Sequence, residues 1–149
     1  MRRTDRECTD SKFMNDVLET AREISLAFKT DDFPYTIPLN FVLYNSHLYI
    51  HCASEGRKLD LIAADSRVAF SAYVDARVYR HTTYYRCVCG TGHACVVDDA
   101  EEKQNALHAL SLKYGSACQY PTPQEMLDRI AVVRIEIASC TGKAHLPKN

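Results

Sequence analysis

The sequence predicts a mainly β protein, a β-barrel with peripheral helices. Several apolar or alternating segments follow one another with short polar turns between them, and the helical patterns lie mostly outside these strand runs. The chain has 149 residues, of which 46% are hydrophobic and 25% charged, values that are ordinary for one globular domain. We therefore expect residues 1–149 to form a single domain.

The N-terminal segment predicts a helix followed by a strand. Asp10 suits the N-cap position of that helix, because its carboxylate can accept hydrogen bonds from the first free backbone N–H groups. Residues 24–28 then alternate between apolar and polar or small side chains, as in a strand with one buried face, and a polar turn follows at 29–32. The apolar positions with helical spacing are Phe13, Met14, Val17, Leu18 and Ala21.

The next segment predicts a β-hairpin. Pro34–Tyr44 has the composition of a strand, and its two prolines imply a sheet edge, a bulge or a break in the ladder. Asn45 and Ser46 form a short turn signal, and His47–Ala53 follows as the second strand. Apolar side chains occupy both faces of that strand, so the face that does not line the barrel also needs a cover. A dimer interface is the economical cover, and we expect a homodimer.

The rest of the chain predicts further strands and helices. Asp98 or Asp99 suits the N-cap of the longest helix, and Gly115 suits its end. The expected elements are, in order, a short helix around 59–62, strands over Val68–Val74 and Thr83–Val97, a helix over Ala100–Tyr114, a short helix after the proline-containing linker 120–123, and a last strand over Ile130–Ile137.

Charge and composition argue against several classes of function. Lysine and arginine total 18 and aspartate and glutamate 19, so the basic excess typical of nucleic-acid binding is absent. No apolar run approaches the ~20 residues that span a bilayer, which predicts no membrane partner. The charged N-terminus is followed by no apolar signal segment, and the seven cysteines are an odd number, so we expect reduced thiols in the cytoplasm.

Cysteine and histidine gather in one short segment, at Cys87, Cys89, His93 and Cys95. These residue types bind zinc, and a tight turn at either of the glycines between them could bring them together. On a continuous strand, however, the four side chains would share one face and stretch over roughly 26 Å, whereas zinc ligands lie about 2.0–2.3 Å from the ion. We therefore expect buried strand cysteines and no metal site.

The stretch 49–60 carries the strongest functional signal. A strand ends there, a turn follows at Gly56, and Arg57 and Lys58 begin a helix. Backbone N–H groups at a helix N-terminus attract anions, and two cations there oppose the helix dipole unless an anion neutralises them. The pattern indicates a phosphate site, although two solvated cations on a surface helix would give the same residues.

Several motifs occur in a fixed order along most of the chain. They are Arg2-Arg3-x-Asp5-Arg6-Glu7, Pro34-Tyr35-x-x-Pro38-Leu39-Asn40-Phe41 and Tyr49-x-His51-x-Ala53-x-x-Gly56-x-Lys58, with shorter matches at Tyr85-Arg86-Cys87-Val88, Glu101-Glu102-Lys103 and Thr141-Gly142-Lys143. This ordered set resembles the nitroimidazole-resistance (Nim) branch of the pyridoxamine 5′-phosphate oxidase-like family. The resemblance implies the FMN-binding split-barrel fold.

The resemblance also implies a homodimer with FMN sites at the subunit interface. Arg57 and Lys58 would hold the FMN phosphate, the strand 38–41 would offer backbone hydrogen bonds to the flavin ring, and Arg86 would approach from the partner subunit or a neighbouring strand. Two cysteines stand where the family commonly has serine. The expected cofactor-binding residues are Pro38, Leu39, Asn40, Phe41, His51, Cys52, Arg57, Lys58, Arg86 and Cys87.

By the same resemblance, the protein is an oxidoreductase that passes electrons from a nicotinamide donor through FMN to a small acceptor, such as a nitroaromatic. His51 is the candidate catalytic residue, as a proton donor. The alternatives are a flavin- or haem-binding protein without turnover, and a ligand-free dimerisation module. The C-terminal Arg/His pattern associated with pyridoxamine phosphate oxidase is not found, so that activity is not expected.

Overall fold

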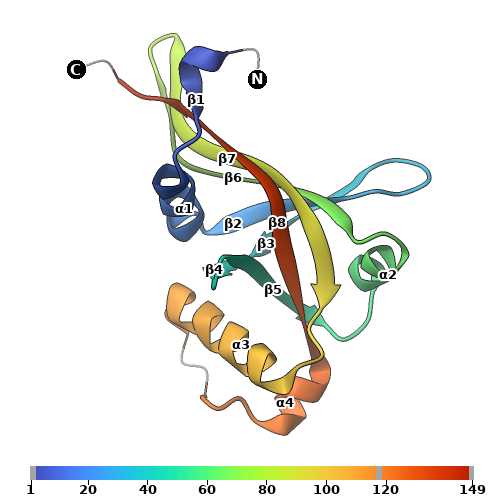
Figure 1. Cartoon of the computed structure of the whole chain (residues 1–149). Coiled ribbons are helices and arrows are strands. Elements are labelled where there is room, and N and C mark those ends of the chain that lie inside the picture. The colour runs from blue at the N-terminus through green and yellow to red at the C-terminus, as the bar shows by residue number, and fades with distance from the viewer. Residues whose placement is uncertain (1–2, 117–118, 148–149) are drawn as a thin grey trace.

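The computed structural model describes residues 3–116 and 119–147, which form a curled antiparallel sheet with helices around it (Figure 1). The predicted fold class is confirmed. Within this part of the chain, no helix has the length and apolar character needed to cross a membrane. The elements are a 3₁₀ turn Thr4–Arg6, β1 Glu7–Cys8, α1 Ser11–Thr20, β2 Glu23–Phe28, β3 Tyr35–Asn40, β4 Val42–Tyr44, β5 His47–Ala53, α2 Arg57–Ala64, β6 Arg67–Tyr79, β7 Thr82–Val96, α3 Ala100–Tyr114, α4 Gln124–Arg129 and β8 Ile130–His145.

The chain itself joins the two edges of the sheet. In the order of hydrogen-bonded neighbours the strands run β3-β2-β6-β7-β8-β5-β4, and β1 pairs with β8. The outermost strands, β3 and β4, are consecutive in the chain and only Phe41 separates them. The two edges therefore meet at Phe41, and we call this junction the seam.

Phe41 belongs to neither ladder, so its backbone groups need other partners. The hydroxyl of Tyr114, at the end of α3, accepts a hydrogen bond from the Phe41 N–H at 2.9 Å and lies 3.0 Å from the Phe41 carbonyl oxygen. The same hydroxyl is within hydrogen-bond distance of the Arg22 carbonyl. Lys113 Nζ lies 3.8 Å from the centroid of the Phe41 ring. The C-terminal end of α3 thus holds the seam.

The proline-containing segment is interrupted, as one of the sequence alternatives allowed. We expected one strand over Pro34–Tyr44, and the structure has two, β3 and β4, with a break at Phe41. Pro38 lacks an N–H donor, and β3 lies at a sheet edge, where the loss of a donor is tolerated. Asn45 and Ser46 have positive φ angles of 47° and 65°, and they form the predicted tight turn between β4 and β5.

Two predicted elements have their expected bounds, and two strands are longer than expected. The strand His47–Ala53 and the helix Ala100–Tyr114 are confirmed, and Gly115 ends that helix with a φ of 64°. β6 and β8 continue well beyond their predicted ends at Val74 and Ile137. The added part of β6 is exposed, so the alternation of apolar and polar residues that marks a half-buried strand is absent there.

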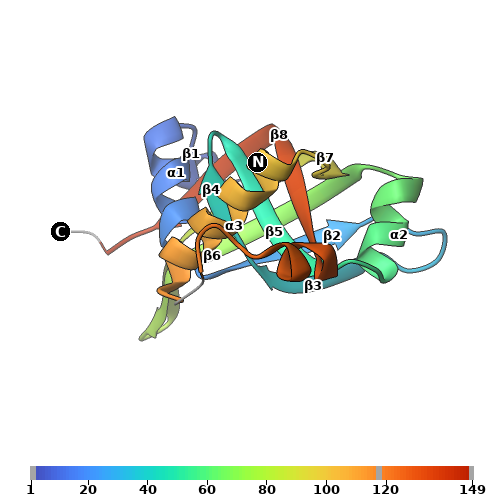
Figure 2. The ribbon, with the colours of Figure 1, turned by 90° about the horizontal axis from the view of Figure 1, so that it is seen from below.

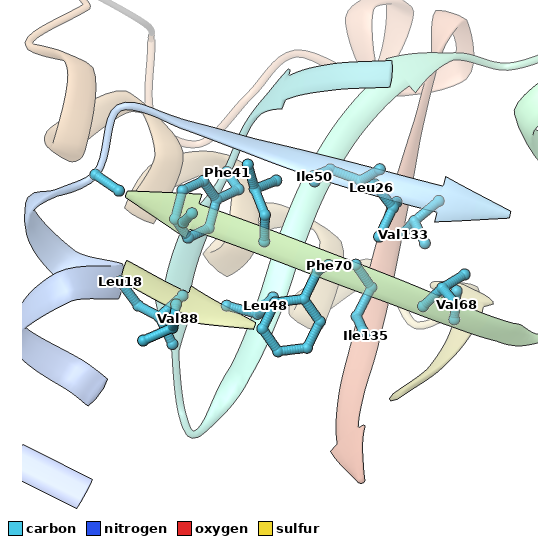
Figure 3. Packing of buried hydrophobic residues seen from close by; sticks show 14 of the residues in the cluster. Leu18, Leu26, Phe41, Leu48, Ile50, Val68, Phe70, Val88, Val133 and Ile135 are labelled. Atoms are coloured by element: carbon cyan, nitrogen blue, oxygen red, sulfur yellow. The ribbon is translucent and has the colours of Figure 1, made fainter. Parts of the chain in front are cut away.

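Apolar side chains fill both sides of β5. The main core lies inside the curled sheet, where Phe41 from the seam, Phe70 from β6 and Ile135 from β8 come together (Figure 3). A second, smaller cluster lies between the sheet and α3, which crosses β4 and β5 in Figure 2. This cluster comprises Val42, Tyr49, Val97, Ala106, Leu110 and Val132.

On the second face of β5, α3 of the same chain covers Tyr49, whereas His51 and Ala53 are exposed. Leu48 and Ile50 belong to the main core, and Tyr49 belongs to the cluster beneath α3. At Tyr49 the cover comes from α3 and not from the dimer interface that the sequence made the economical cover, because the periodicity shows that a face is apolar but not what packs on it. The homodimer itself stays a prediction.

Candidate functional site

The N-terminus of α2 carries two cations and has no capping side chain. Gly56 occupies the N-cap position with a φ of 130°, a conformation that favours glycine. By contrast, Asp10 and Asp99 cap α1 and α3 through their carboxylates. Among the described residues, neither Arg57 nor Lys58 has an ion-pair partner. The free N–H groups and the two cations together favour an anion.

This end of α2 lies beside β3 and the end of β5. The guanidinium carbon of Arg57 is 4.5 Å from the centroid of the Tyr35 ring, at the start of β3. Burial raises the pKa of the Cys52 thiol, and the charge of Lys58 lowers it in part. The structure thus brings Arg57, Lys58 and Cys52 to one place, with Cys52 as a neutral thiol at physiological pH.

β3 and β5 present two edges that are not hydrogen-bonded to each other, and we call the space between them the split. Among the described residues, β3 pairs only with β2, and the last four residues of β5 pair only with β8. The register of β4 against β5, continued past Phe41, sets Asn40 opposite His51 and Leu39 opposite Cys52. Unpaired backbone groups along these edges are available to a ligand.

A cavity of about 510 Å³ lies at the seam end of the split, beneath α3. Asn40 and His51 both line it, so two more of the predicted site residues come together here. The volume falls within the ~300–1,000 Å³ typical of small-molecule sites. Between Tyr35, next to the cations of α2, and Asn40, at the cavity, β3 extends over roughly 17 Å at about 3.3 Å per residue.

The predicted strand segment 38–41 divides into two parts. Pro38 and Asn40 are exposed, and Leu39 packs against the main core. Phe41 is completely buried, and both of its backbone groups lie against the Tyr114 hydroxyl. Phe41 is therefore engaged in the seam and offers neither side chain nor backbone to a ligand.

Arg86 and Cys87 lie on β7, apart from the split. Arg86 is held by two carboxylates: its Nε donates to Asp75 at 2.7 Å, and Nη1 pairs with Asp16 of α1. Burial raises the pKa of the Cys87 thiol. In the ladders, Arg86 pairs with Val74 and Ala144, neither of which is a predicted site residue. Within one protomer, Arg86 therefore does not reach the split from a neighbouring strand.

The four cysteine and histidine side chains do not converge on one point. β7 runs without a turn through both glycines, so Cys87, Cys89, His93 and Cys95 are spread along one strand. The described ranges contain no group of three side chains arranged to hold a metal ion. The expectation of buried strand cysteines is wrong for Cys89, which is exposed, while the other two cysteines are partly buried. Cys118 lies outside the described residues.

The sequence reasoning missed two residues that line the cavity, Tyr114 and Arg22. Tyr114 follows Leu107 by seven residues and Leu110 by four, which is the spacing of one helix face and could have placed it beside them. Arg22 lies in the short link between α1 and β2, where its guanidinium carbon is 5.1 Å from the centroid of the Tyr114 ring. No pattern in the sequence points to Arg22.

Comparison with known families agrees with this geometry. The family model described as pyridoxamine 5′-phosphate oxidase matches residues 10–144. The chain belongs to this family. The resemblance inferred from the ordered motifs is thereby confirmed, and the curled sheet is the split barrel of the family. A comparison with curated proteins finds no match.

Solved structures with the same fold include three that align over most of this chain. A candidate 5-nitroimidazole antibiotic resistance protein from Bacteroides thetaiotaomicron has a TM-score of 0.82 and 22% identity, covering 93% of this chain and 86% of its own. The flavocytochrome Anf3 from Azotobacter vinelandii has a TM-score of 0.84 and 16% identity, with coverages of 99% and 72%. An FAD- and haem-binding protein from Mycobacterium smegmatis has a TM-score of 0.83 and 18% identity, with coverages of 97% and 76%. At these identities the likeness establishes the fold.

Proposed function

We propose that this protein is a homodimeric, cytoplasmic oxidoreductase that binds FMN in the split. The observation that carries the proposal is the order of features along β3. The cations Arg57 and Lys58, at the uncapped N-terminus of α2, lie at one end, a free strand edge of about 17 Å follows, and the cavity lies at the other end. FMN has the same order of groups, namely a phosphate, a flexible chain and a flat ring. The existence of FAD-binding proteins with this fold supports the proposal.

Each predicted residue that faces the split has a physical role in this proposal. Arg57 grips the phosphate through its planar fork of donors, and Lys58 adds a point charge beside the free N–H groups of α2. The exposed edge of β3 at Pro38 and Asn40 offers backbone carbonyls, and Asn40 adds a side-chain amide, toward the polar rim of the ring. Cys52 supplies a weak donor where a hydroxyl is common in the family.

FMN bound here would supply the redox chemistry, namely hydride and electron transfer between a nicotinamide donor and a small acceptor. His51 lines the cavity, where its imidazole is in place to act as the proton donor to the acceptor. Leu107 and Leu110 of α3 limit the access of water. A nitroaromatic is the acceptor suggested by the resistance protein that shares the fold.

The phosphate grip is tested by replacing Arg57 and Lys58 together with alanine and titrating FMN and riboflavin. We expect FMN affinity to fall at least about tenfold, because two charged contacts are lost, and riboflavin affinity to change less than about twofold, because riboflavin has no phosphate. Arg129→Ala on α4, where the exposed arginine pairs with Glu125, is the matched control. An equal loss for the two ligands would contradict the assignment.

The alternative is binding without turnover, of flavin or of haem. Both His51 and His108 line the cavity, and imidazole is a common haem ligand. The absorbance spectrum of gently purified protein separates the possibilities. Flavin bands with FMN released on denaturation would support the proposal, whereas a Soret band that disappears in His51→Ala would put haem in its place. A colourless protein that ignores added FMN would contradict both.

A further inference from the structure

The α3 cavity is lined by basic side chains and by no described carboxylate. Among the described lining residues, Arg22, His51 and His108 are basic and none is acidic. The Arg22 side chain is exposed and stacks on Tyr114, and within residues 3–116 and 119–147 it has no ion-pair partner. The cavity therefore offers a cation whose hydrogen-bond donors are available to an anion.

The rest of the wall is largely apolar. Leu107 and Leu110 come from α3, Met126 from α4, and Ile130 from the start of β8. Such a wall favours a compact hydrophobic body, because water is removed from apolar surface on both sides when it binds. A ligand that satisfies both parts of the cavity has one anionic group and one apolar body.

We propose that this cavity binds an organic carboxylate with a compact aromatic or aliphatic body, its carboxylate at Arg22 and its body against α3 and α4. The identification of this ligand as the electron acceptor rests on the proposed function. The binding itself does not, because neither Arg57 nor Lys58 lines the cavity. His51 also lines the wall and so lies within the same enclosure as the ligand.

Two negative features near the cavity weaken the binding of an anion, and one of them, Glu23, provides a further variant for the test. Glu23 is the ladder partner of Asn40 across β2 and β3, and directly paired residues share a face of the sheet, so its carboxylate lies on the side of the cavity although it does not line it. The C-terminal end of α3, at Tyr114, carries a partial negative charge. Arg22 is thus the group that selects an anion, and removing the charge of Glu23 should strengthen binding.

The test compares 2-naphthoate with 2-naphthamide, which share one body and differ in charge. Each is titrated calorimetrically into the full-length protein as purified, and again with added FMN. We expect naphthoate to bind at least about fivefold more tightly than naphthamide, since a hydrogen-bonded charge pair has a value of that order. Arg22→Gln should abolish the preference without weakening naphthamide. Glu23→Gln should increase naphthoate affinity about twofold.

Arg77→Gln, near the end of β6, is the matched control and should keep the preference of the wild type. Circular dichroism confirms that each variant is folded. Equal affinity for the two compounds, a preference that survives Arg22→Gln, or no binding of either compound would overturn the proposal. A protein that binds naphthoate through Arg22 but never binds FMN would keep the carboxylate site and reject the proposed function.

Discussion

Lys113 donates a hydrogen bond from Nζ to the Leu18 carbonyl at 3.0 Å and lies over the Phe41 ring, so its ammonium group has lost much of its water. Burial, with a smaller contribution from the charge of Arg22, lowers the pKa of Lys113 from 10.5 to about 8, although Glu19 and Glu23 raise it in part. Between these two pH values the unfolded chain binds more protons at Lys113 than the folded protein does.

We expect Lys113 to make the free energy of unfolding rise with pH from about 8 to 10.5. The cost of burying the charge is present in full below pH 8 and fades as the folded protein loses the proton. Thiols whose pKa burial raises, such as those of Cys52 and Cys140, act in the opposite direction. The quantity to measure is therefore the difference between wild type and Lys113→Met in urea unfolding at several pH values.

That difference should move in favour of the wild type as the pH rises. An exposed lysine of α1 gives the control variant, Lys12→Met, whose difference from the wild type should stay constant. A wild-type advantage that is independent of pH for Lys113→Met would contradict the inference that this ammonium is desolvated.

At the residue scale, the sequence could name several site residues but not their partners. The place of Arg57 and Lys58 at the start of a helix was predictable because a turn at Gly56 followed by helical spacing is a local pattern, and their role in binding an anion stays a prediction. Arg86 has no such pattern: its carboxylate partners are Asp75, 11 positions away, and Asp16, 70 positions away. Contacts across such separations arise from the folded sheet, so the motif alone could not show that Arg86 is already paired.

At the scale of elements, the end of α3 and the seam behave as one unit. Tyr114→Phe removes the hydroxyl that serves the Phe41 N–H and carbonyl, and leaves a buried donor without a partner. We expect the free energy of unfolding to fall by about 1–3 kcal/mol, the usual cost of such a group. Because Asn40 precedes the seam, FMN affinity should fall as well if FMN lies along β3. Urea unfolding and an FMN titration measure the two effects.

Tyr120→Phe provides a tyrosine control. The Tyr120 ring is exposed, and within the described residues its hydroxyl makes only a long hydrogen bond to Asn105, at 3.4 Å. This variant should be as stable as the wild type within about 0.5 kcal/mol. If Tyr114→Phe were equally stable, the hydroxyl would not be holding the seam.

The bounds of the elements show how far local patterns extend. The strand His47–Ala53 was predictable because a turn signal precedes it and its own side chains are apolar. The break after β3 was foreseeable from proline, but its position was not, because Phe41 is an ordinary strand residue. Its separation from both ladders follows from β3 and β4 pairing with different neighbours, β2 and β5, which no short window of sequence contains.

At the scale of the whole molecule, a row of small side chains crosses the outer face of the sheet. Ala27 pairs with Ala69, Ala69 with Thr91, and Thr91 with Ser139, so the row spans β2, β6, β7 and β8. Ala69, Thr91 and Ser139 are exposed, and the two hydroxyls lie 2.8 Å apart. Small side chains make a flat surface that a second sheet can approach closely. We expect the interface of the proposed homodimer here.

Ala69→Arg should therefore weaken the dimer. Sedimentation of the wild type should give about twice the chain mass of 16.9 kDa, and the variant should sediment as a monomer at concentrations where the wild type is dimeric. Asp128→Arg, on an exposed position of α4, is the control for added positive charge and should remain dimeric. A wild type that is monomeric while it binds FMN tightly would contradict the interface.

The sequence was sufficient to predict the fold class of the whole molecule. It was not sufficient to predict which elements close the barrel. Alternation and turn signals are local, and they were sufficient for an antiparallel barrel with peripheral helices. The helix that covers β5 comes from Ala100–Tyr114, some 50 residues later, and its apolar face does not specify which strand it meets. For the same reason, the apolar side chain of Tyr49 on β5 did not show whether a helix of the same chain or a second protomer would cover it.

Because only Phe41 links β3 to β4, the length of the chain at the seam is fixed. A residue inserted beside Phe41 would shift β4 by one position, and because strand side chains alternate with a period of two, Val42 and Tyr44 would turn from the α3 cluster toward the main core and Leu43 would turn the other way. A deletion would pull β3 out of its ladder with β2 in the same way. Among relatives with this fold, length variation is thus compatible with the hairpin between β6 and β7 but not with the step from Asn40 to Val42. An alignment gap at that step would mark a protein that closes its barrel differently.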